Sequence, residues 1–68
     1  LPDTTALVSH GLKLKKAGEL RQAEAVLKIA ADLDPTDPNR PFHLGNVYSA
    51  EQKLADARAA FEQALSIR

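Results

Sequence analysis

Hydrophobic positions recur at helical spacing in four separate stretches of the chain. In the first stretch, Leu7, Gly11 and Leu14 follow one another at i, i+4 and i+7, as on one face of an α-helix. Three more patterns of this spacing follow, over residues 20–33, 44–48 and 54–65. The pattern therefore predicts an all-α chain of four helices.

Signals for helix ends separate these four patterns. Asp3-Thr4-Thr5 offers N-cap side chains before the first helix, and Gly18 is a natural stop after it. Asp34-Pro35 ends the second, because the residue before a proline is pushed out of helical space. Asp37-Pro38 restarts the chain with an acidic N-cap and a proline at the first helical position. Gln52, not glycine, stands near the last break. Such short connections predict antiparallel neighbouring helices.

The two halves of the chain match when Gly11 is aligned with Gly45, and we call this shift the repeat offset. In this alignment, small residues are paired with small residues and bulky residues with bulky residues. The further matching pairs are Asp3 and Asp37, Leu14 and Tyr48, Leu20 and Leu54, Ala23 and Ala57, Ala25 and Ala59, Leu27 and Phe61, and Ala30 and Ala64. We expect the glycines to let the two helices of a hairpin approach closely, and the alanines to keep the second helix thin.

Two motifs within this repeat resemble those of the tetratricopeptide (TPR) family. The repeat offset equals the period of that family, which is about 34 residues. Leu44-Gly45-x-x-Tyr48 is similar to the family's L-G-x-x-Y core, and Ala57-x-x-x-Phe61 to its A-x-x-x-F core. The resemblance implies two tandem helix-turn-helix repeats in a single domain over residues 1–68. Repeat 1 would cover approximately 4–37 and repeat 2 approximately 38–68. Together they would form a right-handed α-solenoid fragment of four antiparallel helices.

The first unit departs from the family pattern. Leu7, and Pro41 in the second unit, stand where the family has a large aromatic residue, and His10 replaces the leucine before Gly11. We expect His10 to be a hydrogen-bonded residue on the core side. The alternative, a coiled-coil hairpin, requires an apolar seven-residue register that this chain does not keep.

Composition and charge narrow the classes of function. Nine basic and nine acidic residues balance, so no global field attracts nucleic acid or an anionic membrane. No apolar run approaches the roughly 20 residues of a membrane-spanning helix, and Leu1-Pro2-Asp3 does not begin a signal peptide. The lack of cysteine fits a reducing compartment, so we expect a cytoplasmic location. The absence of an initiator Met and the helical pattern at the last residues are expected of cuts in a longer array.

The resemblance implies that a ligand lies along the concave side, which the first helix of each repeat lines. The candidate peptide-binding residues share that face, and they are Thr5, Val8, Leu12, Lys15, Asn39, Phe42, Asn46 and Ser49. Packing against a preceding repeat is the alternative for Val8 and Leu12, and filling the gap beside Pro41 is the alternative for Phe42. Asn46 can both donate to and accept from a peptide backbone.

Some TPR proteins clamp a C-terminal carboxylate with lysine and asparagine. Val8, Leu12 and Phe42 occupy the matching places and only Asn46 agrees, so an apolar or extended peptide is the better expectation. The lysines at positions 13, 15 and 16 are interpreted as solvated charges at a helix C-terminus, where they suit the dipole. They lack interleaved aromatic residues, so they do not indicate nucleic-acid binding.

The sequence carries no sign of catalysis, metal or cofactor. His10 and His43 are the two histidines and no cysteine joins them, whereas zinc needs three or four convergent ligands. Ser9 and His10 are neighbours that point apart on a helix, so they form no nucleophile–base pair. His43 flanks the expected groove, where its protonation would modulate binding.

The sequence therefore predicts a non-enzymatic interaction module that binds a protein or peptide. One alternative is a chaperone similar to the TPR chaperones of type III secretion, suggested weakly by Pro41-Phe42-His43. A second alternative is a self-assembling element that forms a homo-oligomer, since the last helix has no following cap.

Overall fold

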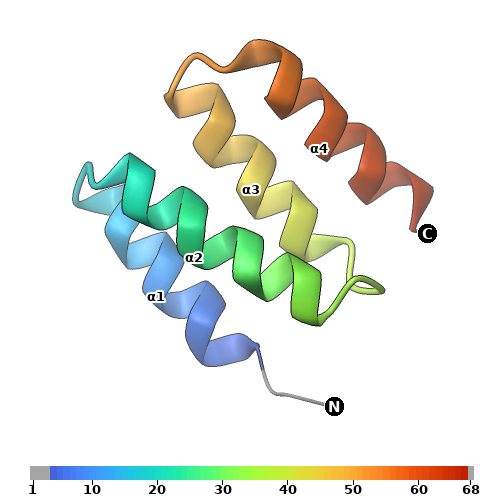
Figure 1. Ribbon diagram of the computed structural model, residues 1–68, viewed down its shortest axis with the longest axis horizontal. Helices are drawn as coiled ribbons and strands as arrows, with labels where there is room; N and C mark the ends of the chain where they lie inside the picture. The colour runs from blue at the N-terminus through green and yellow to red at the C-terminus, as the bar shows by residue number, and fades with distance from the viewer. Residues whose placement is uncertain (1–3, 68) are drawn as a thin grey trace.

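The computed structural model describes residues 4–67 of the chain, and this part is all helical. The helices are α1 (Thr5–Lys16), α2 (Leu20–Leu33), α3 (Asn39–Ala50) and α4 (Leu54–Ser66) (Figure 1). Residues 4–67 contain no strand. The predicted four helices are confirmed, while the proposed N-cap role of Asp3 lies outside the described residues.

The helices form two hairpins laid side by side. α1 packs against α2, α2 against α3, and α3 against α4, with a short contact between α1 and α3 (Figure 1). The principal extents are 29 × 25 × 13 Å, so the hairpins make a thin slab and not a closed bundle. Because the slab is thin, much of each helix stays accessible on one side.

The turn inside each hairpin is built in the same way. Glu19 N–H donates to the Leu14 carbonyl at 2.9 Å, and Lys53 N–H donates to the Tyr48 carbonyl at 2.8 Å. Each bond bridges the end of one helix and the start of the next, and the repeat offset carries the first bond onto the second. The sequence repeat is therefore also a repeat of backbone geometry.

Both repeat glycines lie where a second helix crosses closely. A Cβ at Gly11 would lie 2.6 Å from the Leu27 side chain, and one at Gly45 would lie 2.6 Å from the Phe61 ring. Contacts this short do not occur at real Cβ atoms, so a side chain at either position forces its neighbour to move. The predicted role of the two glycines is confirmed.

The core lies along the inner faces of α1, α2 and α3. Its buried members are Val8, Ala23, Leu27, Ala30, Leu44 and Val47. Leu7, Leu14 and Tyr48 pack against this cluster and are partly buried. On α4 the buried side chains are alanines, at positions 57, 60 and 64. Ala23 and Ala30 of α2 are buried like their equivalents Ala57 and Ala64, whereas Ala25 and Ala59 are exposed.

The loop between the hairpins is tied down by Arg40. Its Nε donates to Thr4 Oγ1 at 2.9 Å, and its guanidinium lies 3.7 Å from Asp34 and 3.6 Å from Asp37. Thr4 is buried and makes no side-chain cap on α1. Asp37 Oδ1 accepts from Asn39 N–H at 2.9 Å, but α3 begins at Asn39, one residue later than predicted, so Pro38 and not Asp37 occupies the N-cap position.

The interpretation of His10 as a core-side residue is wrong, because His10 is exposed. Its equivalent Leu44 is buried because α3 lies against α2 of the preceding hairpin. α1 has no preceding hairpin beside it in the described chain, so the same helix position faces outward there.

Candidate functional site

The predicted binding residues lie on α1 and α3, the first helices of the two hairpins, as the helical spacing required. Leu12 is 37% exposed and Phe42 is 47% exposed. Thr5, Asn39 and Ser49 are also exposed, whereas Lys15 and Asn46 are half-buried. All the candidate side chains except Val8 therefore retain contact with solvent.

Val8 departs from this expectation. Its side chain is only 8% exposed and belongs to the same core cluster as Leu44 and Val47. Neither of those residues is on α1, so Val8 serves to join the hairpins. The expected exposure of Val8 is wrong, because α1 meets α2 and α3 at this point.

Phe42 combines packing with exposure. Its ring centroid lies 5.8 Å from that of Phe61 on α4 and 6.0 Å from that of His43. Tilted and edge-on arrangements at these distances are favourable for aromatic pairs. Phe61 thus holds Phe42 from one side and leaves nearly half of its surface open.

Asn46 lies one helical turn beyond Phe42, on the same side of α3. Its amide is half-buried and makes no hydrogen bond to the described part of the chain. An amide carries two donors and an acceptor, so Asn46 keeps its hydrogen-bonding capacity for something outside the chain.

His43 links this surface electrostatically to α1. Burial lowers the pKa of His43 below its usual value, and the charges of Arg40 and Lys15 lower it further, against the opposing effect of Asp37. Lys15 is on α1 and His43 is on α3, so the charge of one first helix acts weakly on a side chain of the other.

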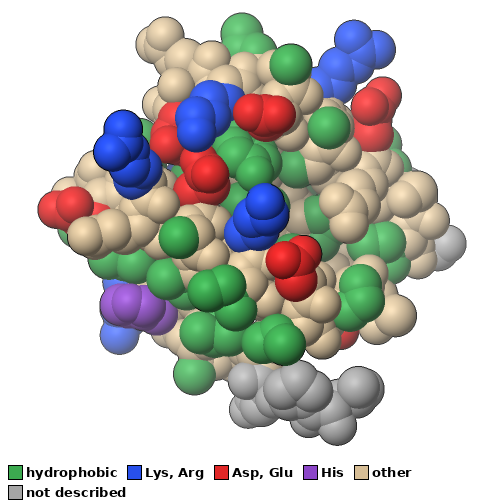
Figure 2. Space-filling model, in the orientation of Figure 1, with side chains coloured by type: hydrophobic (Ala, Val, Ile, Leu, Met, Phe, Trp, Pro, Cys, Tyr) green, Lys and Arg blue, Asp and Glu red, His purple; other side chains and the backbone are tan. Residues whose placement is uncertain are grey.

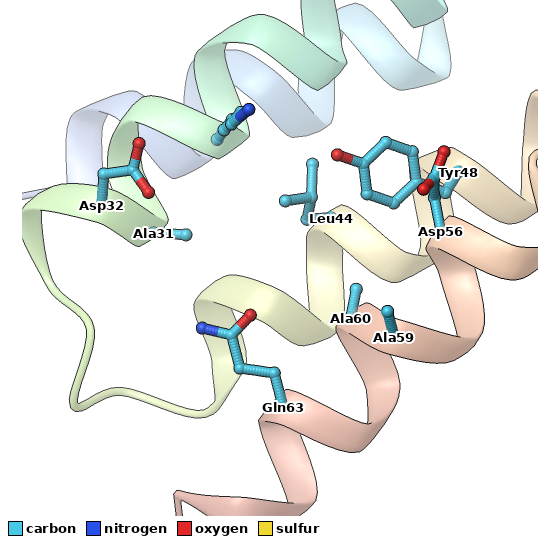
Figure 3. Close-up of a pocket in the computed structure, with 9 residues that line it drawn as sticks. Ala31, Asp32, Leu44, Tyr48, Asp56, Ala59, Ala60 and Gln63 are labelled. Atoms are coloured by element: carbon cyan, nitrogen blue, oxygen red, sulfur yellow. The ribbon is translucent and has the colours of Figure 1, made fainter.

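A second concave region, on the α2 and α4 side, has no counterpart among the sequence predictions. It encloses about 230 Å³, and we call it the α2/α4 hollow (Figure 3). Leu44 and Tyr48 of α3 lie between the two flanking helices (Figure 3). The other lining residues are Lys28, Ala31 and Asp32 of α2 and Asp56, Ala59, Ala60 and Gln63 of α4. The alanines at 31, 59 and 60 are the sequence signal that could have found it, because small side chains leave room where helices face each other.

A charged cluster beside the hollow joins the hairpins. Lys53 Nζ lies 2.9 Å from Glu24 Oε1 and 3.8 Å from Glu51 Oε2. The hydrogen bond from Lys53 lowers the pKa of Glu24, while the neighbouring Glu24 carboxylate and burial raise the pKa of Glu51. The pair of Glu24 and Lys53 therefore links α2 to the α3–α4 turn.

The remaining charges are dispersed. On the face shown in Figure 2, basic and acidic side chains intermingle and do not gather by sign. Lys13, Lys15 and Lys16 lie in the last turn of α1, as predicted. Across residues 4–67, no three His, Cys, Asp or Glu side chains gather in a way that could hold a metal ion. In the same range, no helix combines the length and apolar character needed to cross a bilayer.

No family model matches the chain, and no curated protein matches it significantly.

Proposed function

We propose that this chain is a pair of TPR-type repeats that binds an extended, partly apolar segment of another protein across α1 and α3. The observation that carries the proposal is the half-buried Asn46 amide, which has no hydrogen bond within the described chain and lies one turn from the exposed face of Phe42. The amide is accessible from solvent and unpaired, so both its donors and its acceptor are available to a ligand.

The repeated geometry supports the TPR part of the proposal. The turn hydrogen bonds, the close glycine approaches and the buried alanines recur at the family's period. Neighbouring repeats of that kind place their first helices side by side, and α1 and α3 touch here.

The chemistry of the surface favours an extended peptide. The Asn46 amide can pair with both the N–H and the C=O of a peptide backbone. Leu12 on α1 and Phe42 on α3 are exposed and offer apolar contacts to the side chains of such a peptide. Leu12 occupies the position on α1 that Asn46 occupies on α3. Lys15 adds one positive charge, which favours an acidic residue in the ligand.

An array of synthetic peptides that alternate apolar and polar residues tests this function. The wild-type chain should select a subset of peptides, and Asn46→Ala and Phe42→Ala should each lose at least tenfold in affinity, equivalent to about 1.4 kcal/mol. Gln22→Ala, an exposed amide on α2, is the matched control and should bind like wild type. If both groove variants bind the selected peptides as tightly as wild type, the proposal is wrong.

Self-assembly is the second candidate function, because large apolar side chains on α2 and α4 are exposed, namely Ile29, Leu33, Leu54 and Leu65. The resemblance to type III secretion chaperones stays a prediction from the sequence.

A further inference from the structure

The contact between the two hairpins provides a template for a contact between molecules. Ala31 of α2 and Gln63 of α4 line the α2/α4 hollow from opposite helices. If another hairpin stacks on this chain as the second hairpin stacks on the first, the residues equivalent to Ala31 and Gln63 face each other across the new contact.

The repeat offset carries Ala31 to Leu65 and carries Gln63 back to Ile29. Leu65 is 63% exposed and Ile29 is 52% exposed. We call Ile29 and Glu19 the leading face, and Arg58 and Leu65 the trailing face. The equivalents of Leu65 and Ile29 inside the chain, Ala31 and Gln63, line the α2/α4 hollow.

We propose that copies of this chain stack head to tail, with the trailing face of one copy against the leading face of the next. In this arrangement Leu65 of one copy and Ile29 of the next would line a new hollow from opposite helices, as Ala31 and Gln63 line the α2/α4 hollow within the chain. His10 then lines a new hollow between copies, in the position that Leu44 occupies in the α2/α4 hollow.

Charge complementarity selects a second copy as the occupant. The ion pair between Glu24 and Lys53 bridges the hairpins at 2.9 Å. The repeat offset carries Glu24 to Arg58 and carries Lys53 back to Glu19. Arg58 takes the place of the acidic residue and Glu19 takes the place of the basic one, so the two charges remain opposite. Arg58 of one copy can therefore form an ion pair with Glu19 of the next.

Both groups are available for that pair. Glu19 is exposed, and Arg58 makes only an exposed ion pair with Glu62 at 3.6 Å within its own helix. Exposed pairs of this kind contribute little, so Arg58 can exchange partners at small cost.

The two faces differ from each other, so the contact is heterologous and leaves a free face at each end of every assembly. The mass of the assembly should therefore grow continuously with concentration and should not stop at a dimer. Association is independent of the peptide surface on α1 and α3, so it survives if the proposed function fails.

Sedimentation velocity of the chain from micromolar to millimolar concentration tests the proposal. Wild type should show a rising average mass, and Leu65→Glu and Ile29→Glu should each be monomeric alone. An equimolar mixture of these two variants should form a heterodimer and nothing larger, because it holds one intact face of each kind. Leu12→Glu, an exposed apolar residue on α1, is the control and should associate like wild type.

Charge reversal gives the second arm of the test. Arg58→Glu and Glu19→Arg should each weaken association by roughly three- to tenfold, and the double variant should restore it. Lys16→Glu should have no such effect. A wild-type monomer at all concentrations overturns the proposal, and so does a mixture that forms no heterodimer. Loss of association in Leu65→Glu but not in Ile29→Glu indicates a symmetric contact and also overturns it.

Discussion

Gln52 adopts the left-handed backbone conformation, with φ of 62°, that Gly18 adopts with φ of 83° one repeat earlier. Both residues follow the last turn of a first helix and precede an equivalent turn hydrogen bond. The same backbone thus forms with and without glycine.

Replacing Gln52 by glycine should stabilise the chain. Left-handed geometry costs an L-residue about 1–2 kcal/mol, and part of this gain is offset by the entropy of glycine. We expect Gln52→Gly to raise the free energy of unfolding by about 1 kcal/mol in urea titration. Gly18→Gln should lower it by a similar amount, and since a Cβ at Gly18 meets nothing within 4 Å, that cost would come from the backbone alone. Equal stability of Gln52→Gly and wild type contradicts this account of the turn.

Gly45→Ala should destabilise the hairpin formed by α3 and α4. The new methyl group would lie 2.6 Å from the Phe61 ring, and overpacking of this kind costs about 1–3 kcal/mol. Phe61→Ala removes the obstructing ring, so the double variant should lose less stability than the two single losses combined. Strict additivity in thermal and urea unfolding would show that the close approach does not constrain this position.

Arg40→Ala should loosen the connection between the hairpins. The guanidinium contacts Thr4, Asp34 and Asp37 and is largely shielded from water. Loss of these contacts should lower the free energy of unfolding by about 1–2 kcal/mol. The exposed Arg21 is the control, because surface substitutions usually stay within about 0.5 kcal/mol. The same small change for both variants would show that Arg40 does not fix the loop.

His43 should make stability depend on pH. Burial lowers the pKa of folded His43, so the unfolded chain takes up a proton more readily than the folded one. The stabilising contribution is present above the unfolded value of about 6.5 and is lost as the pH falls through that value towards the lower folded pKa. His43→Gln should flatten the fall in stability between neutral and mildly acidic pH.

His10→Gln, at an exposed position, is the control for this experiment and should retain the wild-type profile. A profile that His10→Gln flattens and His43→Gln leaves unchanged would contradict the assignment to His43.

The helices and their order are predictable because local signals mark their ends. Asp34 leaves the helical region before Pro35, with φ of −134°, as the steric effect of proline requires. Gly18 and the two repeat glycines likewise follow from local geometry and from the repeat offset. These features depend on residues close in sequence or equivalent in the repeat.

The errors arise where a side chain's surroundings depend on a second hairpin. The pattern predicts burial of His10 like that of Leu44, but burial at that position needs a preceding hairpin, which α1 lacks in the described chain. The same pattern predicts an open Val8, yet α2 and α3 converge on it. The α2/α4 hollow has the same origin, because its walls come from separate hairpins.

The position of a bound peptide tests the central claim most directly. A peptide selected on the array would be titrated into isotopically labelled chain while backbone amide shifts are followed by NMR. The account predicts the largest changes at Leu12, Phe42 and Asn46 on α1 and α3. Changes confined to residues that line the α2/α4 hollow, such as Lys28 and Gln63, would contradict it.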